Sequence, residues 1–367
     1  MAENLSLARG ATGQKVLSAP KDPPSFSEAL DLWHYDLYEL GMMAEDLRKK
    51  TVGDVVTFVA NYNINYTNVC VYRCPLCAFY KEKGEEGAYF LSVEEMLKQA
   101  AEAVWLGATE LHVVGGIIPE LTVEYFEKFF SEVKRRWPFL TIKALTATEV
   151  SYLARINRMS VKEVLERLKE AGLDAMPGGG AEVLDDEVLK VIAPAKSAEE
   201  WLRTIETAHE LGIRTNATML YGHVERPEHI IRHLMRIREL QEKTGGFLTF
   251  ILLKFKPKNT ELWRKGLVKH EAPAPYDAKV VAISRIVLNG FINNISVYWV
   301  GYGKKYASAL LNFGGSDLVG TAFSEKIFRS AEAHDGYATL EELAHYARTS
   351  GRVPAQRDTF FNIIRYL

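Results

Sequence analysis

The sequence predicts an α/β protein, a (β/α) barrel of TIM type with N-terminal and C-terminal helical extensions. Two observations predict this fold class. From Val55 onward, short runs rich in β-branched and aromatic residues alternate with longer segments of helical period, which is typical of parallel strands joined by crossover helices. The cysteines, the glycine pairs and several isolated polar residues follow the ends of predicted strands, where the loops of a barrel converge on one face.

Six strand and helix units are clear in the sequence, and a seventh is weaker. So many consecutive units favour a barrel over an open doubly wound sheet. The expected strands lie at 54–61, 109–116, 140–147, 173–180, 213–223, 247–257 and 295–303, and the expected helices at 92–107, 122–137, 160–172, 185–193, 198–212, 227–245 and 274–290, with 306–315 completing the weaker seventh unit.

The chain divides into three predicted parts. Residues 1–50 form an N-terminal extension, partly disordered and then helical from residue 25. Residues 51–323 form the barrel, and residues 324–367 form a C-terminal helical extension. Both ends are expected to pack against the barrel rather than to take part in chemistry.

Composition and charge exclude several classes of protein. Hydrophobic residues make up 47% of the chain, which is enough for the core of a soluble globular protein. The formal net charge is -2, with acidic and basic residues mixed along the chain, so no nucleic-acid partner is expected. No stretch reaches the roughly 20 apolar residues of a spanning helix, and the N-terminus has no apolar leader. No membrane partner and a cytoplasmic location are therefore expected.

The chain has three cysteines, and all of them lie within eight positions: Cys70, Cys74 and Cys77. Their spacing also suits the buried stripe of a helix, but Pro75 disfavours a helix and favours a loop. A structural zinc ion is a second alternative, although zinc prefers four protein ligands. An iron–sulfur cubane is normally held by four thiolates. Three thiolates would leave one iron open to a cofactor, and we favour this interpretation.

The spacing Cys70-x3-Cys74-x2-Cys77 resembles the signature of the radical S-adenosylmethionine (SAM) superfamily. The resemblance implies a radical SAM barrel that holds a [4Fe-4S] cluster, with SAM bound to the open iron through its amino and carboxylate groups. Leu76 stands where the superfamily usually has an aromatic residue. Leu76 and Phe79 are expected to contact the cofactor.

Three further strand ends are expected to bind SAM. Gly115 and Gly116 match a glycine-containing motif of the superfamily, although two glycines after a strand are also an ordinary turn. The three glycines of 177–182 indicate close backbone approach to a ligand, or otherwise a flexible connection. The expected cofactor residues from these ends are Gly115, Gly116, Thr146, Glu149, Gly179 and Glu182.

Polar residues at other strand ends are candidates for substrate binding and catalysis. His223 lies in a strand-end loop, where its protonation could assist proton transfer, although a lone histidine is more often structural. Lysines after the sixth strand could meet a substrate carboxylate, or could simply lie on the surface. The expected catalytic residue is His223, and the expected substrate-binding residues are Asn65, Tyr66, Asn216, Tyr221 and Lys254.

The motifs NINYTNVCVYRC, PGGGAE and NATMLYGH resemble aminofutalosine synthase of the futalosine route to menaquinone. The resemblance implies that the 5′-deoxyadenosyl radical adds to 3-[(1-carboxyvinyl)oxy]benzoate and gives 6-amino-6-deoxyfutalosine, bicarbonate and methionine. It also implies a ferredoxin or flavodoxin as the electron donor. One departure is Lys256, where the synthases tend to have histidine.

Two alternatives stay open. The chain also resembles the dehypoxanthine futalosine cyclase and the tyrosine-using subunit of the deazaflavin (FO) synthase, which share the barrel and the cysteine motif. A second alternative is a non-catalytic metal-binding barrel or an electron-transfer protein.

Overall fold

The computed structural model describes residues 7–9, 15–17, 22–333 and 336–367. Most of the N-terminal segment predicted to be disordered lies outside the described residues. Strands β1 (Leu7–Arg9) and β2 (Lys15–Leu17) form an antiparallel pair. The predicted N-terminal helix is present as α1 (Phe26–Asp31), a 3₁₀ turn (Leu32–His34) and α2 (Leu37–Val52).

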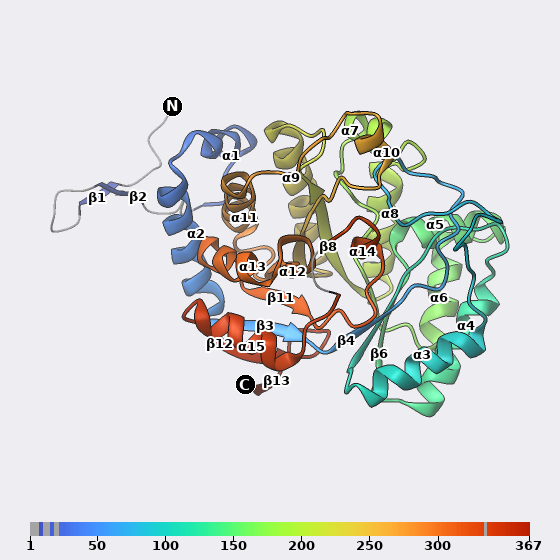
Figure 1. Cartoon of the computed structure of the whole chain (residues 1–367). Coiled ribbons are helices and arrows are strands. Elements are labelled where there is room, and N and C mark those ends of the chain that lie inside the picture. The colour runs from blue at the N-terminus through green and yellow to red at the C-terminus, as the bar shows by residue number, and fades with distance from the viewer. Residues whose placement is uncertain (1–6, 10–14, 18–21, 334–335) are drawn as a thin grey trace.

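The barrel predicted from the sequence is confirmed as a curled parallel sheet. Strands β3 and β4 follow one another with one residue between them; β4 pairs with β5, and β3 pairs with β11, so the sheet curls back on its first strand (Figure 1). The strands of the barrel are β3 (Val55–Val59), β4 (Asn61–Ile64), β5 (Glu110–Val113), β6 (Thr141–Ala144), β7 (Ala175–Met176), β8 (Arg214–Tyr221), β9 (Phe247–Lys254), β10 (Ile295–Val297) and β11 (Asp317–Gly320).

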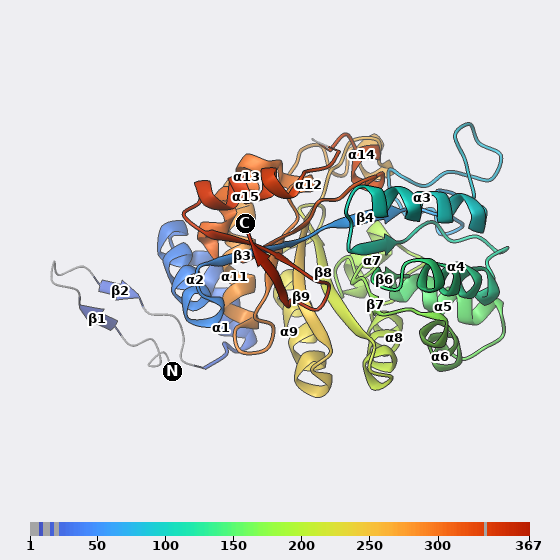
Figure 2. The ribbon, with the colours of Figure 1, turned by 90° about the horizontal axis from the view of Figure 1, so that it is seen from below.

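Helices surround the sheet, with the apolar core between the two layers (Figure 2). Helix α4 is representative, because Phe126, Phe129 and Phe130 face the core while its charged residues face outward. The helices after α2 are α3 (Val93–Trp105), α4 (Val123–Arg136), α5 (Ala147–Ile156), α6 (Val161–Ala171), α7 (Asp186–Ile192), α8 (Ala198–Glu210), α9 (Pro227–Thr244), α10 (Glu261–Arg264), α11 (Ala274–Leu288), α12 (Trp299–Tyr302), α13 (Lys304–Leu310), α14 (Ile327–Ser330) and α15 (Leu340–Thr349).

Two parts of the secondary structure differ from the sequence prediction. Strand β11 had no counterpart among the predicted strands, and it completes the barrel beside β3. The helical prediction for the last residues is wrong, because β12 (Val353–Arg357) and β13 (Ile363–Tyr366) are strands. Strand β12 pairs with β3 over four residues, and the Arg357 guanidinium lies 2.6 Å from the buried Asp317 carboxylate. These long-range contacts decide the conformation of the C-terminus.

No helix within the described ranges is both long and apolar enough to cross a membrane.

Candidate active site

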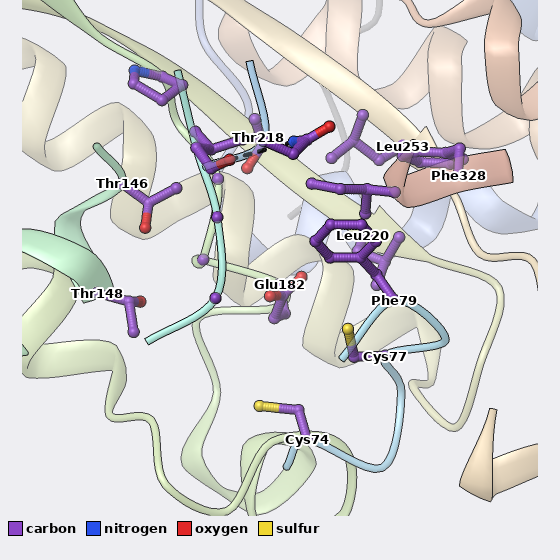
Figure 3. Close-up of a pocket in the computed structure, with 18 of the residues that line it drawn as sticks. Cys74, Cys77, Phe79, Thr146, Thr148, Glu182, Thr218, Leu220, Leu253 and Phe328 are labelled. Atoms are coloured by element: carbon purple, nitrogen blue, oxygen red, sulfur yellow. Dashed lines mark hydrogen bonds between the residues drawn. The ribbon is translucent and has the colours of Figure 1, made fainter. Parts of the chain in front are cut away.

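A cavity of about 330 Å³ lies inside the barrel at the carboxyl ends of the strands, as expected for this fold. Residues from β4, β5, β6, β8 and β9 line it, together with the cysteine loop and residues around α14. Figure 3 shows Cys74 and Cys77 at one end of the cavity. The structure thus brings together strand ends that are far apart in the sequence.

The segment from Cys70 to Cys77, the cysteine loop, is not helical, as Pro75 predicted. Backbone hydrogen bonds hold it in place. The Pro75 carbonyl accepts from the backbone N–H groups of Glu261 and Leu262, and the Cys77 N–H donates to the Cys74 carbonyl at 2.9 Å. All three cysteines line the cavity. Burial raises the pKa of the Cys74 thiol to about 12, so a cation at the loop would be needed to hold it as a thiolate.

The geometry of the thiols fits a cluster better than a single ion. A tetrahedral zinc ion holds its ligand atoms within a few ångströms of one another. In the described part of the chain, only Asp185, Glu187 and His229 form a group of three potential ligands whose ligand atoms lie within 4.8 Å of one another. At least one pair of the cysteine sulfurs therefore lies farther apart than 4.8 Å, which is wider than one tetrahedral ion requires and leaves room for a cluster.

The glycine turn after β5 packs against the cysteine loop. A Cβ atom on Gly116 would collide with the carbonyl of Val69, and one on Gly115 would lie 2.9 Å from the Tyr66 ring. Both glycines line the cavity. The structural reason for glycine here is contact with the protein's own loop, whereas the sequence prediction gave approach to a ligand as the reason.

Glu149 organises the neighbouring strand end. It forms a capping box with Thr146 at the start of α5, accepts from the Tyr66 hydroxyl at 2.8 Å, and accepts from the Gly115 N–H at 3.0 Å. Burial raises the pKa of the Glu149 carboxyl, although these donors oppose that shift. Thr146 and Glu149 both line the cavity, and Glu149 fixes the glycine turn beside the cysteines.

The glycine loop of 177–182 carries a buried ion pair that the sequence prediction missed. Glu182 lies 2.5 Å from the Lys196 ammonium, and both side chains line the cavity. Burial alone would lower the pKa of the Lys196 ammonium, but Glu182 and Cys74 raise it overall. This loop therefore places a positive charge near the thiols. Lys196 lies between two predicted helices, so strand-end reasoning gave no signal for it.

Several predicted site residues do line the cavity. They are Asn65, Leu76, Phe79, Gly179 and Asn216. The buried Asn65 side-chain oxygen has no hydrogen-bond partner among the described residues, so it is available to a ligand.

Four predicted residues do not face the cavity. Tyr66 supports the glycine turn, and Tyr221 donates to Asp277 at 2.8 Å inside the protein. The Lys254 ammonium lies 2.7 Å from the buried Asp277 carboxylate instead of meeting a substrate. His223 packs its ring against Phe255, with its Nδ1 2.9 Å from Glu225. The side chain of His223 is fully buried, so it is placed to support the loop rather than to reach a bound substrate.

The cavity also contains residues that the sequence prediction missed. Asn61 and Asn63 recur with period two along β4, together with the predicted Asn65 just after it, so the three side chains share one inner face. His112 and Lys143 face inward from the next two strands, where burial and the neighbouring Lys143 lower the pKa of His112 to about 4. The alternating asparagines were the available signal, because buried polar side chains need hydrogen-bond partners, which a ligand in the cavity would supply.

Comparison with known proteins assigns the family. The family model described as "Radical SAM superfamily" matches residues 64–237, and that described as "CofH/MqnC C-terminal region" matches residues 244–365. The chain is 41% identical over 357 residues to the 5-amino-6-(D-ribitylamino)uracil–L-tyrosine 4-hydroxyphenyl transferase of Methanothermobacter thermautotrophicus, covering 96% of this chain and 97% of that protein. The chain belongs to the radical SAM superfamily.

A second relative carries the same name. The enzyme of Methanocaldococcus jannaschii is 40% identical over 347 residues, covering 93% of this chain and 97% of that protein. These relatives overturn the prediction of aminofutalosine synthase, and with it the enolpyruvyl benzoate substrate and the place in menaquinone biosynthesis.

Solved structures confirm the radical SAM fold. The FeFe-hydrogenase maturase HydG from Carboxydothermus hydrogenoformans matches with a TM-score of 0.70 and 19% identity, covering 93% of this chain and 78% of that one. Methylornithine synthase matches with a TM-score of 0.71 and 16% identity, covering 91% of this chain and 95% of that one. The cofactors of this superfamily are a [4Fe-4S] cluster and SAM, as the cysteine spacing predicted.

Proposed function

We propose that this chain transfers a 4-hydroxyphenyl-bearing group from L-tyrosine to 5-amino-6-(D-ribitylamino)uracil, using SAM as the source of the radical. One observation carries the proposal: 41% identity over 96% of the chain to an enzyme of that name. The same alternative was open from the sequence, as the tyrosine-using subunit of deazaflavin synthesis.

The residues around the thiols support a cofactor role. Cys70, Cys74 and Cys77 would bind three irons, and the fourth would bind the amino and carboxylate groups of SAM. When bound, the reduced cluster supplies the electron that splits SAM into methionine and a 5′-deoxyadenosyl radical. Glu149 holds the glycine turn in place, and Lys196 offsets the negative charge that three thiolates bring into a buried site.

The composition of the cavity supports two unlike substrates. One side presents amide, imidazole and hydroxyl groups from Asn63, His112 and Thr218, which suit a polyhydroxylated aminouracil. Another side is apolar and suits a phenol ring. Figure 3 shows the apolar residues Leu220, Leu253 and Phe328 grouped away from Thr146 and Thr148.

A one-electron donor of the ferredoxin or flavodoxin type is proposed as the physiological reductant, because the cluster must be reduced before SAM can be split.

The test uses anaerobically reconstituted enzyme with dithionite, SAM, ring-labelled L-tyrosine and the aminouracil. We expect a product whose mass contains both the aminouracil and the label, together with free 5′-deoxyadenosine. The reaction without aminouracil, and the Cys74→Ala enzyme, serve as controls that should give no labelled adduct. A wild-type enzyme that splits SAM but never joins the label to the aminouracil would overturn the proposal.

A further inference from the structure

Lys256 is a buried cation at the wall of the cavity. It lies two residues after the end of β9, its side chain is 4% exposed, and it lines the cavity together with Phe255. A buried ammonium in a binding cavity costs free energy unless it is paired, so its presence calls for an explanation.

Three lysines of the described chain line the cavity, and their partners differ. Lys143 pairs at 2.6 Å with Glu110, whose side chain is fully buried, and Lys196 pairs at 2.5 Å with Glu182, whose side chain is 13% exposed. Lys256 pairs at 2.5 Å with Glu271, whose side chain is 41% exposed. The Lys143–Glu110 pair is closed inside the protein and Glu182 is mostly covered, whereas Glu271 is the most exposed of the three partners and can turn to solvent.

Glu271 also has a second cation at hand. Its carboxylate lies 3.7 Å from the Lys254 ammonium, which is itself paired with Asp277 at 2.7 Å. Glu271 would therefore keep an electrostatic partner if Lys256 turned toward a ligand. Lys256 offers three N–H donors, and the structure gives it one carboxylate acceptor. The remaining donors are free to bind an anionic group in the cavity.

The cavity that Lys256 lines also has apolar and aromatic lining. Leu253, Phe255, Tyr298 and Phe328 line it, and the rings of Tyr298 and Phe328 meet edge to face at 5.2 Å. A cation in a cavity with such a lining matches a molecule that carries a carboxylate close to an aromatic ring. An aminouracil with a ribityl chain has no carboxylate, so it does not match this combination.

We propose that Lys256 binds the α-carboxylate of L-tyrosine, with the phenol ring on the wall formed by Leu253, Tyr298 and Phe328. The inference rests on the proposed function, since it assigns one of its two substrates to a subsite. Lys256 then selects an amino acid over an amine at this position, and the asparagine-rich side is left for the aminouracil.

The first test compares Lys256→Gln with Lys258→Gln in the reconstituted enzyme. Lys258 is 61% exposed and pairs with Glu332 at the surface, so its variant makes the same charge change outside the cavity. We expect Lys256→Gln to raise the KM for L-tyrosine by about tenfold to a hundredfold, as for loss of a charged hydrogen bond, with the KM for the aminouracil nearly unchanged. Lys258→Gln should match the wild type, and Lys256→Arg should recover much of the affinity.

The second test uses tyramine, which lacks the carboxylate. We expect the wild type to bind L-tyrosine much more tightly than tyramine in competition assays, and Lys256→Gln to lose that preference. If the glutamine variant fails to load iron, Lys256→Met, which keeps the apolar stem, provides the same comparison. A preference for L-tyrosine that survives removal of the ammonium would overturn the assignment.

The third test uses a variant that is expected to lower the KM for L-tyrosine instead of raising it. Glu271→Gln removes the carboxylate that competes for Lys256, so the KM for L-tyrosine should fall, whereas a purely structural Lys256–Glu271 pair would give the same loss from either variant. The two proposals fail separately: a wild type that makes no tyrosine adduct refutes the proposed function, and a normal wild type with an unaffected Lys256→Gln enzyme refutes this subsite alone.

Discussion

The two halves of the barrel contribute different kinds of residue to one cavity. The cluster half, residues 55–245, supplies the three cysteines, the glycine turns and the buried carboxylates that hold them. The wall half, residues 246–367, supplies Ile251, Leu253, Phe255, Tyr298 and Phe328, with Lys256 at the edge. Separate family models match most of each half. The comparison teaches that the cysteines and the proposed tyrosine subsite come from different halves, whereas the proposed aminouracil side belongs to the cluster half.

The largest expected effect comes from Cys74→Ala, which removes one of the three cysteines of the cluster half. Loss of one of three thiolates should abolish iron loading and product formation together, because the two remaining thiolates are too few to hold the cubane. Iron content and product mass are measured on the same preparation, with about four irons per chain expected for the wild type. A variant that keeps its iron and splits SAM would show that the division drawn here is wrong.

Glu149→Gln probes the support of the glycine turn. The carboxylate accepts from Thr146 N–H at 2.7 Å and from two other donors, so an amide nitrogen at that position would leave a buried donor unpaired. We expect the free energy of unfolding to fall by about 1–3 kcal/mol, measured by urea titration.

The matched control for Glu149 is Glu163→Gln. Glu163 forms the same capping box with Ser160, but on an exposed helix start. Its variant should lose at most about 0.5–1 kcal/mol, as for a solvent-accessible cap. Equal losses from the two variants would mean that burial of Glu149 does not matter.

Phe328→Ala tests whether the wall half contributes to binding of L-tyrosine. Removing this ring exposes part of the predicted tyrosine subsite to water, so we expect the KM for L-tyrosine to rise by about tenfold. Iron content and the SAM-induced change in the reduced spectrum should stay as in the wild type. Phe360→Ala, at an exposed aromatic outside the cavity, is the control. If SAM binding were also lost in Phe328→Ala, the wall half would contribute to cofactor binding as well, and the prediction would be wrong.

The smallest expected effect concerns the pH dependence of the cluster half. Burial and then Arg214 lower the pKa of His209 to about 4, from 6.5. The native state therefore takes up this proton less readily than the unfolded state, and stability present above pH 6.5 is lost as the pH falls toward 4. In His209→Gln, the slope of unfolding free energy against pH should decrease by about 1 kcal/mol per pH unit at most. Urea titrations from pH 7 to 4.5 measure it, and an unchanged slope would contradict the assignment.

The sequence by itself determined the alternation of strands and helices and the candidate cysteine site. Both depend on residues that are close in the sequence. The spacing of hydrophobic residues differs between strands and helices because their backbone geometries differ. Three thiols and a proline within eight residues already specify a loop that is suited to binding a metal. The sequence also flagged Glu149 and Glu182, because each closely follows a predicted strand.

Tertiary structure alone decided the rest. β12 is a strand because β3 offers an unpaired edge, and Lys196 reaches the cysteines only because its loop is folded over them. Tyr221, His223 and Lys254 stand at strand ends yet turn away from the cavity, since the side chains of a curled sheet alternate between its inner and outer faces and the local fold decides which face is inner. The same geometry brings Lys256 to the cavity two residues after Lys254 is buried against Asp277.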